Sequence, residues 1–132
     1  MPTLTLPQIQ AALRHSWGPD TCDPVDLDDW RPDNPARGQC GVTALVIADL
    51  LGGDLLVGKV FTRDGTLQGY HWWNRLPDGT ELDLTREQFR DGETITAGTF
   101  VPRPNRSPTR CREQYELLRR RVLSYLNQPD DA

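Results

Sequence analysis

The stretch that decides the fold reads GQCGVTALVIADLLGG and occupies residues 38–53. From Val42 to Leu51 it is apolar on nearly all sides, which is long for a strand, and two glycines follow it. A segment of this kind predicts a buried helix, with Cys40 in its first turn. This helix is the expected centre of the fold.

The residues after the central helix predict a small antiparallel sheet. Strand candidates occupy residues 55–61, 67–76 and 81–84, and glycine-containing turns at 63–65 and 77–79 separate them. Thr85 with Gln88 can cap one helical turn through Phe89, and residues 94–101 are expected to hold a further short strand.

Two amphipathic helices are expected toward the ends of the chain. Thr5 and Gln8 form a capping-box pattern for a helix that ends near Trp17, with Ile9, Ala12 and Leu13 on its apolar face. Ser107 as N-cap and Pro108 at the first position predict a C-terminal helix. Its apolar face would carry Cys111, Tyr115, Leu118, Val122 and Tyr125. Between the first helix and the central one, the proline and aspartate residues of 19–37 predict an ordered surface loop.

Length and composition exclude several classes of protein. A chain of 132 residues is about one domain long and can bury roughly two thirds of the surface that its unfolded form exposes. No apolar run approaches the length of about 18 residues that a membrane span needs. We therefore expect one α+β domain over residues 1–132, with no contact to a membrane. Residues 1–10 show no secretory signal pattern, so the expected location is the cytoplasm.

Charge and cysteine content predict neither a nucleic-acid partner nor a metal. Residues 1–100 carry a net charge of -7 and residues 101–132 one of +3. An arginine-rich helix docked on an acidic body explains this better than nucleic-acid binding, because no aromatic platform lies among the arginines. Cys22, Cys40 and Cys111 lack metal-ligand spacing, so no metal or other cofactor is expected.

Cys40 is the candidate nucleophile. The start of a helix presents free N–H groups and a partial positive charge, which favour a thiolate and predict a lowered pKa for this cysteine. The same N–H groups, with the side-chain amide of Gln39, could stabilise an oxyanion. The alternative is that Cys40 is a small buried hydrophobic residue.

His71 is the candidate base, and the turn at 77–79 decides its partner. If Gly79 adopts a positive φ as a bulge after a type I turn, Trp73 lies opposite Asp83, and His71 and Asp83 become diagonal neighbours on one face. A two-residue turn would instead place Asn74 opposite Asp83 and turn His71 away. The sequence Pro77-Asp78-Gly79 favours the bulged turn. A structural histidine among aromatic residues is the alternative role.

These residues also resemble known families. Gly38-Gln39-Cys40, His71-Trp72-Trp73-Asn74 and Leu82-Asp83-Leu84-Thr85 resemble the Cys-His-Asp core of transglutaminase-like and papain-like thiol enzymes. Over about residues 15–127 the chain is similar to the YunG family of small bacterial proteins. The first resemblance implies a papain-like fold, with Cys40 as nucleophile, His71 as base and acid, and Asp83 as the group that orients the imidazole.

The predicted function is acyl transfer or hydrolysis at an amide or thioester of a small molecule, peptide or protein. Asn74 and Gln39 are expected to support the Cys40, His71 and Asp83 triad. The candidate cleft residues are the four tryptophans, Trp17, Trp30, Trp72 and Trp73, although core packing is the alternative for Trp72 and Trp73. A binding or regulatory module that keeps the fold without turnover is the rival prediction. The oligomeric state is left open by the sequence.

Overall fold

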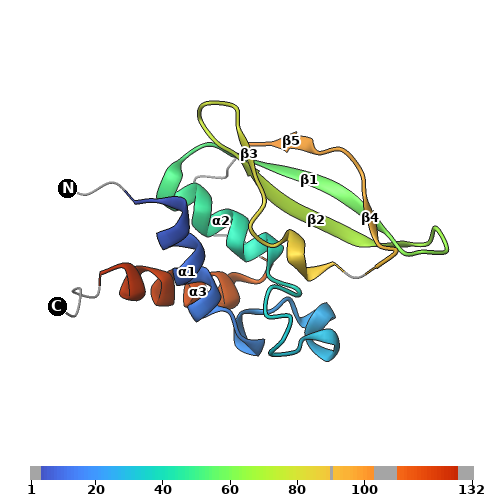
Figure 1. Cartoon of the computed structure of the whole chain (residues 1–132), viewed down its shortest axis with the longest axis horizontal. Coiled ribbons are helices and arrows are strands. Elements are labelled where there is room, and N and C mark those ends of the chain that lie inside the picture. The colour runs from blue at the N-terminus through green and yellow to red at the C-terminus, as the bar shows by residue number, and fades with distance from the viewer. Residues whose placement is uncertain (1–3, 90, 103–109, 128–132) are drawn as a thin grey trace.

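The computed structural model describes residues 4–89, 91–102 and 110–127 and shows a mixed α+β architecture. Helix α2 (Cys40–Leu51) lies between two helices, α1 (Leu6–Ser16) and α3 (Arg112–Leu126), and a curled antiparallel sheet (Figure 1). The predicted central helix is thus confirmed. Among the described residues, no helix is both long and apolar enough to cross a membrane.

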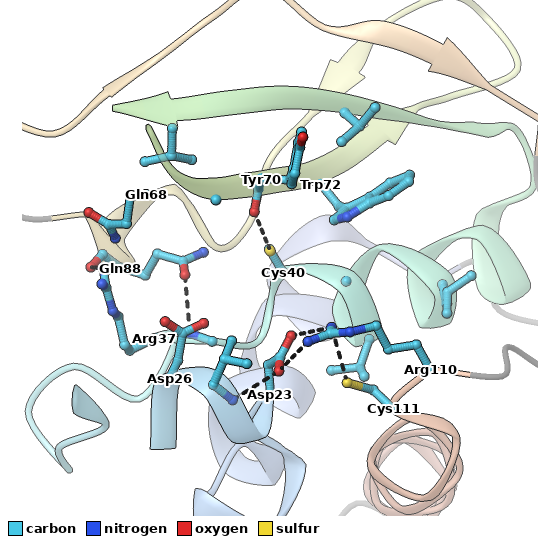
Figure 2. Close-up of a pocket in the computed structure, with 18 of the residues that line it drawn as sticks. Asp23, Asp26, Arg37, Cys40, Gln68, Tyr70, Trp72, Gln88, Arg110 and Cys111 are labelled. Atoms are coloured by element: carbon cyan, nitrogen blue, oxygen red, sulfur yellow. Dashed lines mark hydrogen bonds and ion pairs between the residues drawn. The ribbon is translucent and has the colours of Figure 1, made fainter. Parts of the chain in front are cut away.

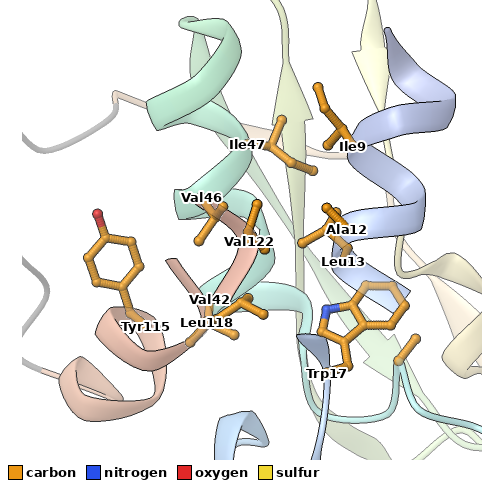
Figure 3. Close-up of a cluster of buried hydrophobic side chains, with 11 residues drawn as sticks. Ile9, Ala12, Leu13, Trp17, Val42, Val46, Ile47, Tyr115, Leu118 and Val122 are labelled. Atoms are coloured by element: carbon orange, nitrogen blue, oxygen red, sulfur yellow. The ribbon is translucent and has the colours of Figure 1, made fainter. Parts of the chain in front are cut away.

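The packing between the three helices forms the main hydrophobic core (Figure 3). Val46 and Ile47 of α2 are buried against α1 and α3, and both predicted apolar faces are present. The buried residues of the two outer helices are Ile9, Ala12 and Leu13 in α1 and Tyr115, Leu118 and Val122 in α3. A chain that folds around one central helix needs both of its neighbours to close this core.

The ends of the helices follow the predicted chemistry in part. The capping box of Thr5 and Gln8 is formed at the start of α1. Helix α3 begins at Arg112, after Cys111 in a left-handed conformation with φ of 56°, whereas the predicted cap and first residue at 107–108 lie outside the described residues. Arg121 of α3 donates to Asp20 at 2.9 Å, as expected for a basic helix on an acidic body.

The sheet contains strands β1 (Asp54–Phe61), β2 (Leu67–Arg75), β3 (Glu81–Leu82), β4 (Thr94–Ile95) and β5 (Thr99–Val101). Its order is β3-β2-β1-β4, and β5 also pairs with β1. Strand β3 is shorter than predicted. The strand expected at 94–101 is divided, because the Thr96 hydroxyl accepts from the Lys59 amide at 2.9 Å and takes the place of a backbone partner there.

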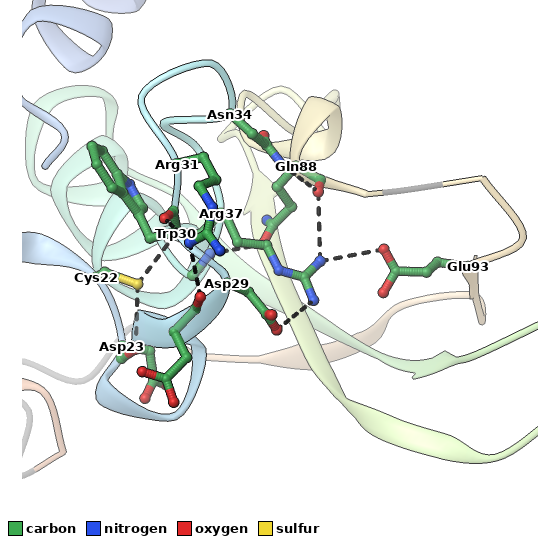
Figure 4. A network of polar contacts seen from close by, with 11 residues as sticks. Cys22, Asp23, Asp29, Trp30, Arg31, Asn34, Arg37, Gln88 and Glu93 are labelled. Carbon is green, nitrogen blue, oxygen red and sulfur yellow. Dashed lines mark hydrogen bonds and ion pairs between the residues drawn. The ribbon is translucent and has the colours of Figure 1, made fainter. Parts of the chain in front are cut away.

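Residues 19–37 are more than the surface loop that the sequence predicted. They contain the 3-10 helices η1 (Pro19–Thr21) and η2 (Pro24–Asp29), and Thr21, Cys22 and Arg37 are buried. Arg37 contacts Glu93 at 3.2 Å and the Gln88 carbonyl at 3.5 Å (Figure 4). The prolines indicate irregular backbone, but they do not indicate that the buried guanidinium of Arg37 connects this segment to Gln88 and Glu93.

Candidate functional site

The hairpin between β2 and β3 brings His71 and Asp83 together. The Leu76 amide donates to the Thr80 carbonyl at 2.8 Å, and Gly79 has a φ of 89°, so the bulged turn is the one that forms. The pairing of Asn74 with Leu82 excludes the alternative register. His71 Nε2 lies 2.7 Å from Asp83 Oδ2, as the diagonal arrangement predicts.

The surroundings of this pair hold both side chains in place. His71 is fully buried, stacks on Trp73 with ring centroids 5.4 Å apart, and meets the edge of Phe89 at 4.7 Å. Arg86 Nε donates to Asp83 at 3.0 Å. Burial disfavours the Asp83 carboxylate, but the hydrogen bonds and charges of His71 and Arg86 outweigh it and lower its pKa.

The second ring nitrogen of His71 is left without a partner. A neutral imidazole that donates to a carboxylate through Nε2 keeps its lone pair on Nδ1. Nδ1 of His71 is buried and has no hydrogen-bond partner within the described structure. A buried acceptor without a donor is costly, so this atom is a candidate to receive a proton.

Cys40 lies at the edge of β2, level with His71 along the strand. Its Sγ is 4.0 Å from the carbonyl oxygen of Tyr70, the residue before His71 (Figure 2). The side chains of His71 and Trp73 project from one face of β2. Those of Trp72 and Asn74 project from the other face, where they contact α2. The thiol thus approaches the backbone beside His71, whereas the imidazole projects from the face of β2 away from α2, and the two groups are not hydrogen-bonded to each other.

The expectation of a low pKa for Cys40 is wrong in this structure. Burial of the thiol raises its pKa to about 11. The backbone amides of Trp72 and Gly41 act in the opposite direction, while the carboxylates of Asp26 and Asp83 raise the pKa further. The positive end of the helix is local, whereas the loss of water around the sulfur depends on the whole fold and has the larger effect.

A cavity of about 760 Å³ lies beside Cys40 (Figure 2). Trp72 lines it, and the sulfur forms part of its wall. The other three tryptophans have structural roles, which corrects the expectation that they line a cleft. Trp17 is in the core and donates to Thr43, Trp30 donates to the Pro35 carbonyl, and Trp73 donates to Glu81 on the other face of the sheet.

Gln39 and Asn74 also have structural partners. Gln39 is fully buried, donates to the Gly18 carbonyl at 3.0 Å and accepts from Thr21 at 2.7 Å, so its amide is directed away from an oxyanion at Cys40. Asn74 Nδ2 donates to the Ala44 carbonyl at 2.9 Å and fastens β2 to α2. Asn74 thus supports the site, whereas Gln39 anchors the segment before it.

Phe89 and the Tyr70 carbonyl are site groups that sequence reasoning missed. Phe89 covers His71 and also lines the cavity. The capping pattern of Thr85 and Gln88 places Phe89 directly after a helical turn, but nothing in it indicates the histidine. The Tyr70 carbonyl is backbone and carries no sequence signal. No group of three metal-ligating side chains occurs in the residues described.

Comparison with known proteins supports a family assignment but no reaction. A family model described as YunG protein matches residues 5–127. The chain is 33% identical over 82 residues to "Uncharacterized protein YunG" of Bacillus subtilis (strain 168), a match that spans 62% of this chain and 61% of that relative. No solved structure matches the chain.

Proposed function

The chain belongs to the YunG family, and we propose that it is a thiol-dependent hydrolase or acyltransferase that acts on an amide or thioester. In this proposal Cys40 is the nucleophile, His71 is the base and acid, and Asp83 orients the imidazole. A helix that starts at the thiol and packs on an antiparallel sheet, with His71 in β2 and Asp83 directly after β3, suits a papain-like or transglutaminase-like architecture.

The observation that carries the proposal is the unpartnered Nδ1 of His71. Asp83 fixes the ring from the Nε2 side at 2.7 Å, so the lone pair lies on the nitrogen that has no hydrogen bond. A histidine with a purely structural role normally has both nitrogens satisfied when it is buried. The thiol of Cys40 lies 4.0 Å from the carbonyl oxygen of Tyr70, the residue before His71.

The proposed reaction has two balanced steps. Cys40 Sγ bonds to the substrate carbonyl carbon while the thiol proton passes to His71 Nδ1, and that proton then leaves with the departing amine or thiol as its bond to carbon breaks. Water or an acceptor amine next bonds to the acyl carbon and gives a proton to His71, and the bond between this carbon and Cys40 Sγ breaks. His71 returns the proton to the sulfur, so the thiol is restored and the acid or amide is released. The free amides in the first turn of α2 are the candidate oxyanion donors.

The raised pKa of Cys40 determines when the proton moves. With a pKa of about 11 the thiol is protonated at neutral pH. His71 must therefore take the proton during attack, because a thiolate does not exist in the resting state. This arrangement makes the histidine essential to each turnover.

Acylation of the protein by p-nitrophenyl acetate tests the proposal. Intact mass and peptide mapping should find one acetyl group on Cys40, with release of nitrophenolate, and Cys40→Ala should abolish both. His71→Gln should slow acylation by at least a hundredfold while Cys22→Ala and Cys111→Ala serve as controls that leave it unchanged. Equal acylation in the wild type and His71→Gln would contradict a catalytic role for the imidazole.

A second candidate function is a binding module without turnover. It is favoured by the raised pKa of Cys40 and by the absence of a hydrogen bond between its thiol and His71. Under this proposal the cavity beside Trp72 would retain a ligand, and substitution of Cys40 by Ala would leave binding intact. The acylation experiment distinguishes the two functions, since only the enzyme releases nitrophenolate through Cys40.

A further inference from the structure

We infer that the substrate carries an uncharged, apolar acyl group, which the cavity beside Cys40 holds between α2 and the sheet. The inference rests on the proposed function and adds the chemical class of the group that Cys40 would accept. Its basis is the distribution of residues around the cavity and the position of the sulfur within that distribution.

One part of the cavity wall is apolar and comes from two elements that face each other. Leu45 of α2 faces the sheet, where Val57 and Trp72 lie opposite each other on β1 and β2. A methyl group added at Gly41 would meet only Trp72, at 3.9 Å, so there is open space next to the nucleophile. The apolar residues of this part of the wall are Val42, Leu45, Leu55, Val57, Val60, Trp72, Phe89 and Val101, and Val25 of η2 is a further apolar residue of the lining.

The other part of the wall is polar and combines residues of the η2 segment with residues from elsewhere in the chain. It includes Asp26 and Gln88, and also Arg110, which donates to Asp23 at 2.9 Å. Cys40 lies between this polar part and the apolar one (Figure 2). A substrate with its carbonyl carbon at the sulfur can therefore place an apolar acyl chain against α2 and the sheet, and a polar leaving group toward η2.

Energetics favour this orientation over its reverse. Each methylene group moved from water to an apolar wall contributes favourably, whereas a charged group placed there would lose its hydration without a partner. The volume of about 760 Å³ lies within the range of pockets that hold small molecules, so it can accept a chain of several carbons. A short polar acyl group would leave most of this wall unused.

A series of p-nitrophenyl esters from acetate to decanoate tests the inference. We expect kcat/KM of the full chain to rise about three- to fourfold per added methylene until the chain fills the cavity. Leu45→Phe should shorten the preferred chain and Leu45→Ala should lengthen it. Leu67→Phe, at a position that is 48% exposed and outside the cavity lining, is the matched control and should leave the preference unchanged.

The outcomes separate this inference from the proposed function. Hydrolysis that needs Cys40 but has equal kcat/KM for acetate and octanoate overturns the inference alone, as does a preference that no Leu45 variant alters. If Leu45→Phe does not fold, Val57→Phe makes the same test from the sheet side.

A second readout applies if no ester is turned over through Cys40, in which case the proposed function fails. Calorimetric titration of Cys40→Ala with decanamide, an uncharged analogue of the acyl chain, then tests the cavity directly. Binding that Leu45→Phe weakens at least tenfold would support an apolar occupant, and no measurable binding would overturn it.

Discussion

The two sides of helix α2 are built in different ways. Toward α1 and α3 it presents Val46 and Ile47, which are 1% exposed and belong to the main core cluster. Toward the sheet it presents the small residues Ala44 and Ala48, with Leu45 beside a cavity. One helix therefore fills the core with its bulky side and leaves space beside the sheet on its small side.

The largest effect is expected on the free energy of unfolding, from a substitution on the side of α2 that faces α1 and α3. Ile47→Ala removes buried atoms that the surrounding helices cannot fully replace, so the free energy of unfolding should fall by about 2 to 5 kcal/mol. Urea unfolding followed by tryptophan fluorescence measures it. Leu6→Ala, at a residue that is 45% exposed, is the control and should change stability by less than about 0.5 kcal/mol. A loss below 1 kcal/mol for Ile47→Ala would refute the comparison.

The second largest effect is expected on the alkylation rate of the Cys40 thiol, at the start of α2. Because the pKa of Cys40 is raised from 9.0 to about 11, its thiolate fraction at pH 8 should be about a hundredfold smaller than that of an ordinary protein thiol. Alkylation by iodoacetamide should accordingly be slow at pH 8 and become faster up to about pH 11. The double variant Cys22→Ala/Cys111→Ala retains Cys40. The alkylation rate of Cys40 is the rate of this double variant minus that of the triple variant that also carries Cys40→Ala. Rapid alkylation at pH 6 would show that burial does not determine the pKa of Cys40.

A smaller effect is expected from Asp83 in acid. Its pKa is lower in the folded protein than in the unfolded chain, so its contribution to stability is present above about pH 4 and is lost as the pH falls through the folded value. The free energy of unfolding of the wild type should therefore decrease more between pH 5 and pH 3 than that of Asp83→Asn. Parallel pH profiles for the two proteins would argue against the charge contacts with His71 and Arg86.

The smallest effect is expected on the cavity side. Val57 is partly exposed and faces open volume, so Val57→Ala should cost about 1 kcal/mol or less. The matched substitution Val46→Ala, on the bulky side of α2, should cost more in the same urea experiment. A reversed order would mean that the cavity wall, and not the helical core, limits stability.

Local chemistry explains which features could be predicted from the sequence. The bulged turn depends on Pro77, Asp78 and Gly79, and it fixes the register that joins His71 to Asp83. The cap of α1 depends likewise on Thr5 and Gln8. In each case the residues that decide the geometry are close together in the chain.

The features that could not be predicted depend on segments far apart in the chain. Gln39 is held by Gly18 and Thr21, and Arg37 reaches Glu93, so neither role is visible from neighbouring residues. The pKa of Cys40 also depends on burial by the complete fold, which outweighs the local influence of the helix start. Patterns within a segment indicate candidate site residues, but the environment of each one depends on the assembled domain.

The contact between His71 and Asp83 depends on the β2–β3 hairpin and not on the helical layer. Both side chains are carried by one continuous segment closed at Gly79, whereas Cys40 is carried by a helix held from the opposite direction by α1 and α3. Loosening of the helical layer would shift the sulfur and leave the imidazole and carboxylate paired. Damage to that layer should therefore reduce the proposed acyl-transfer activity, while the hairpin still gives the spectroscopic signature of an intact contact between His71 and Asp83.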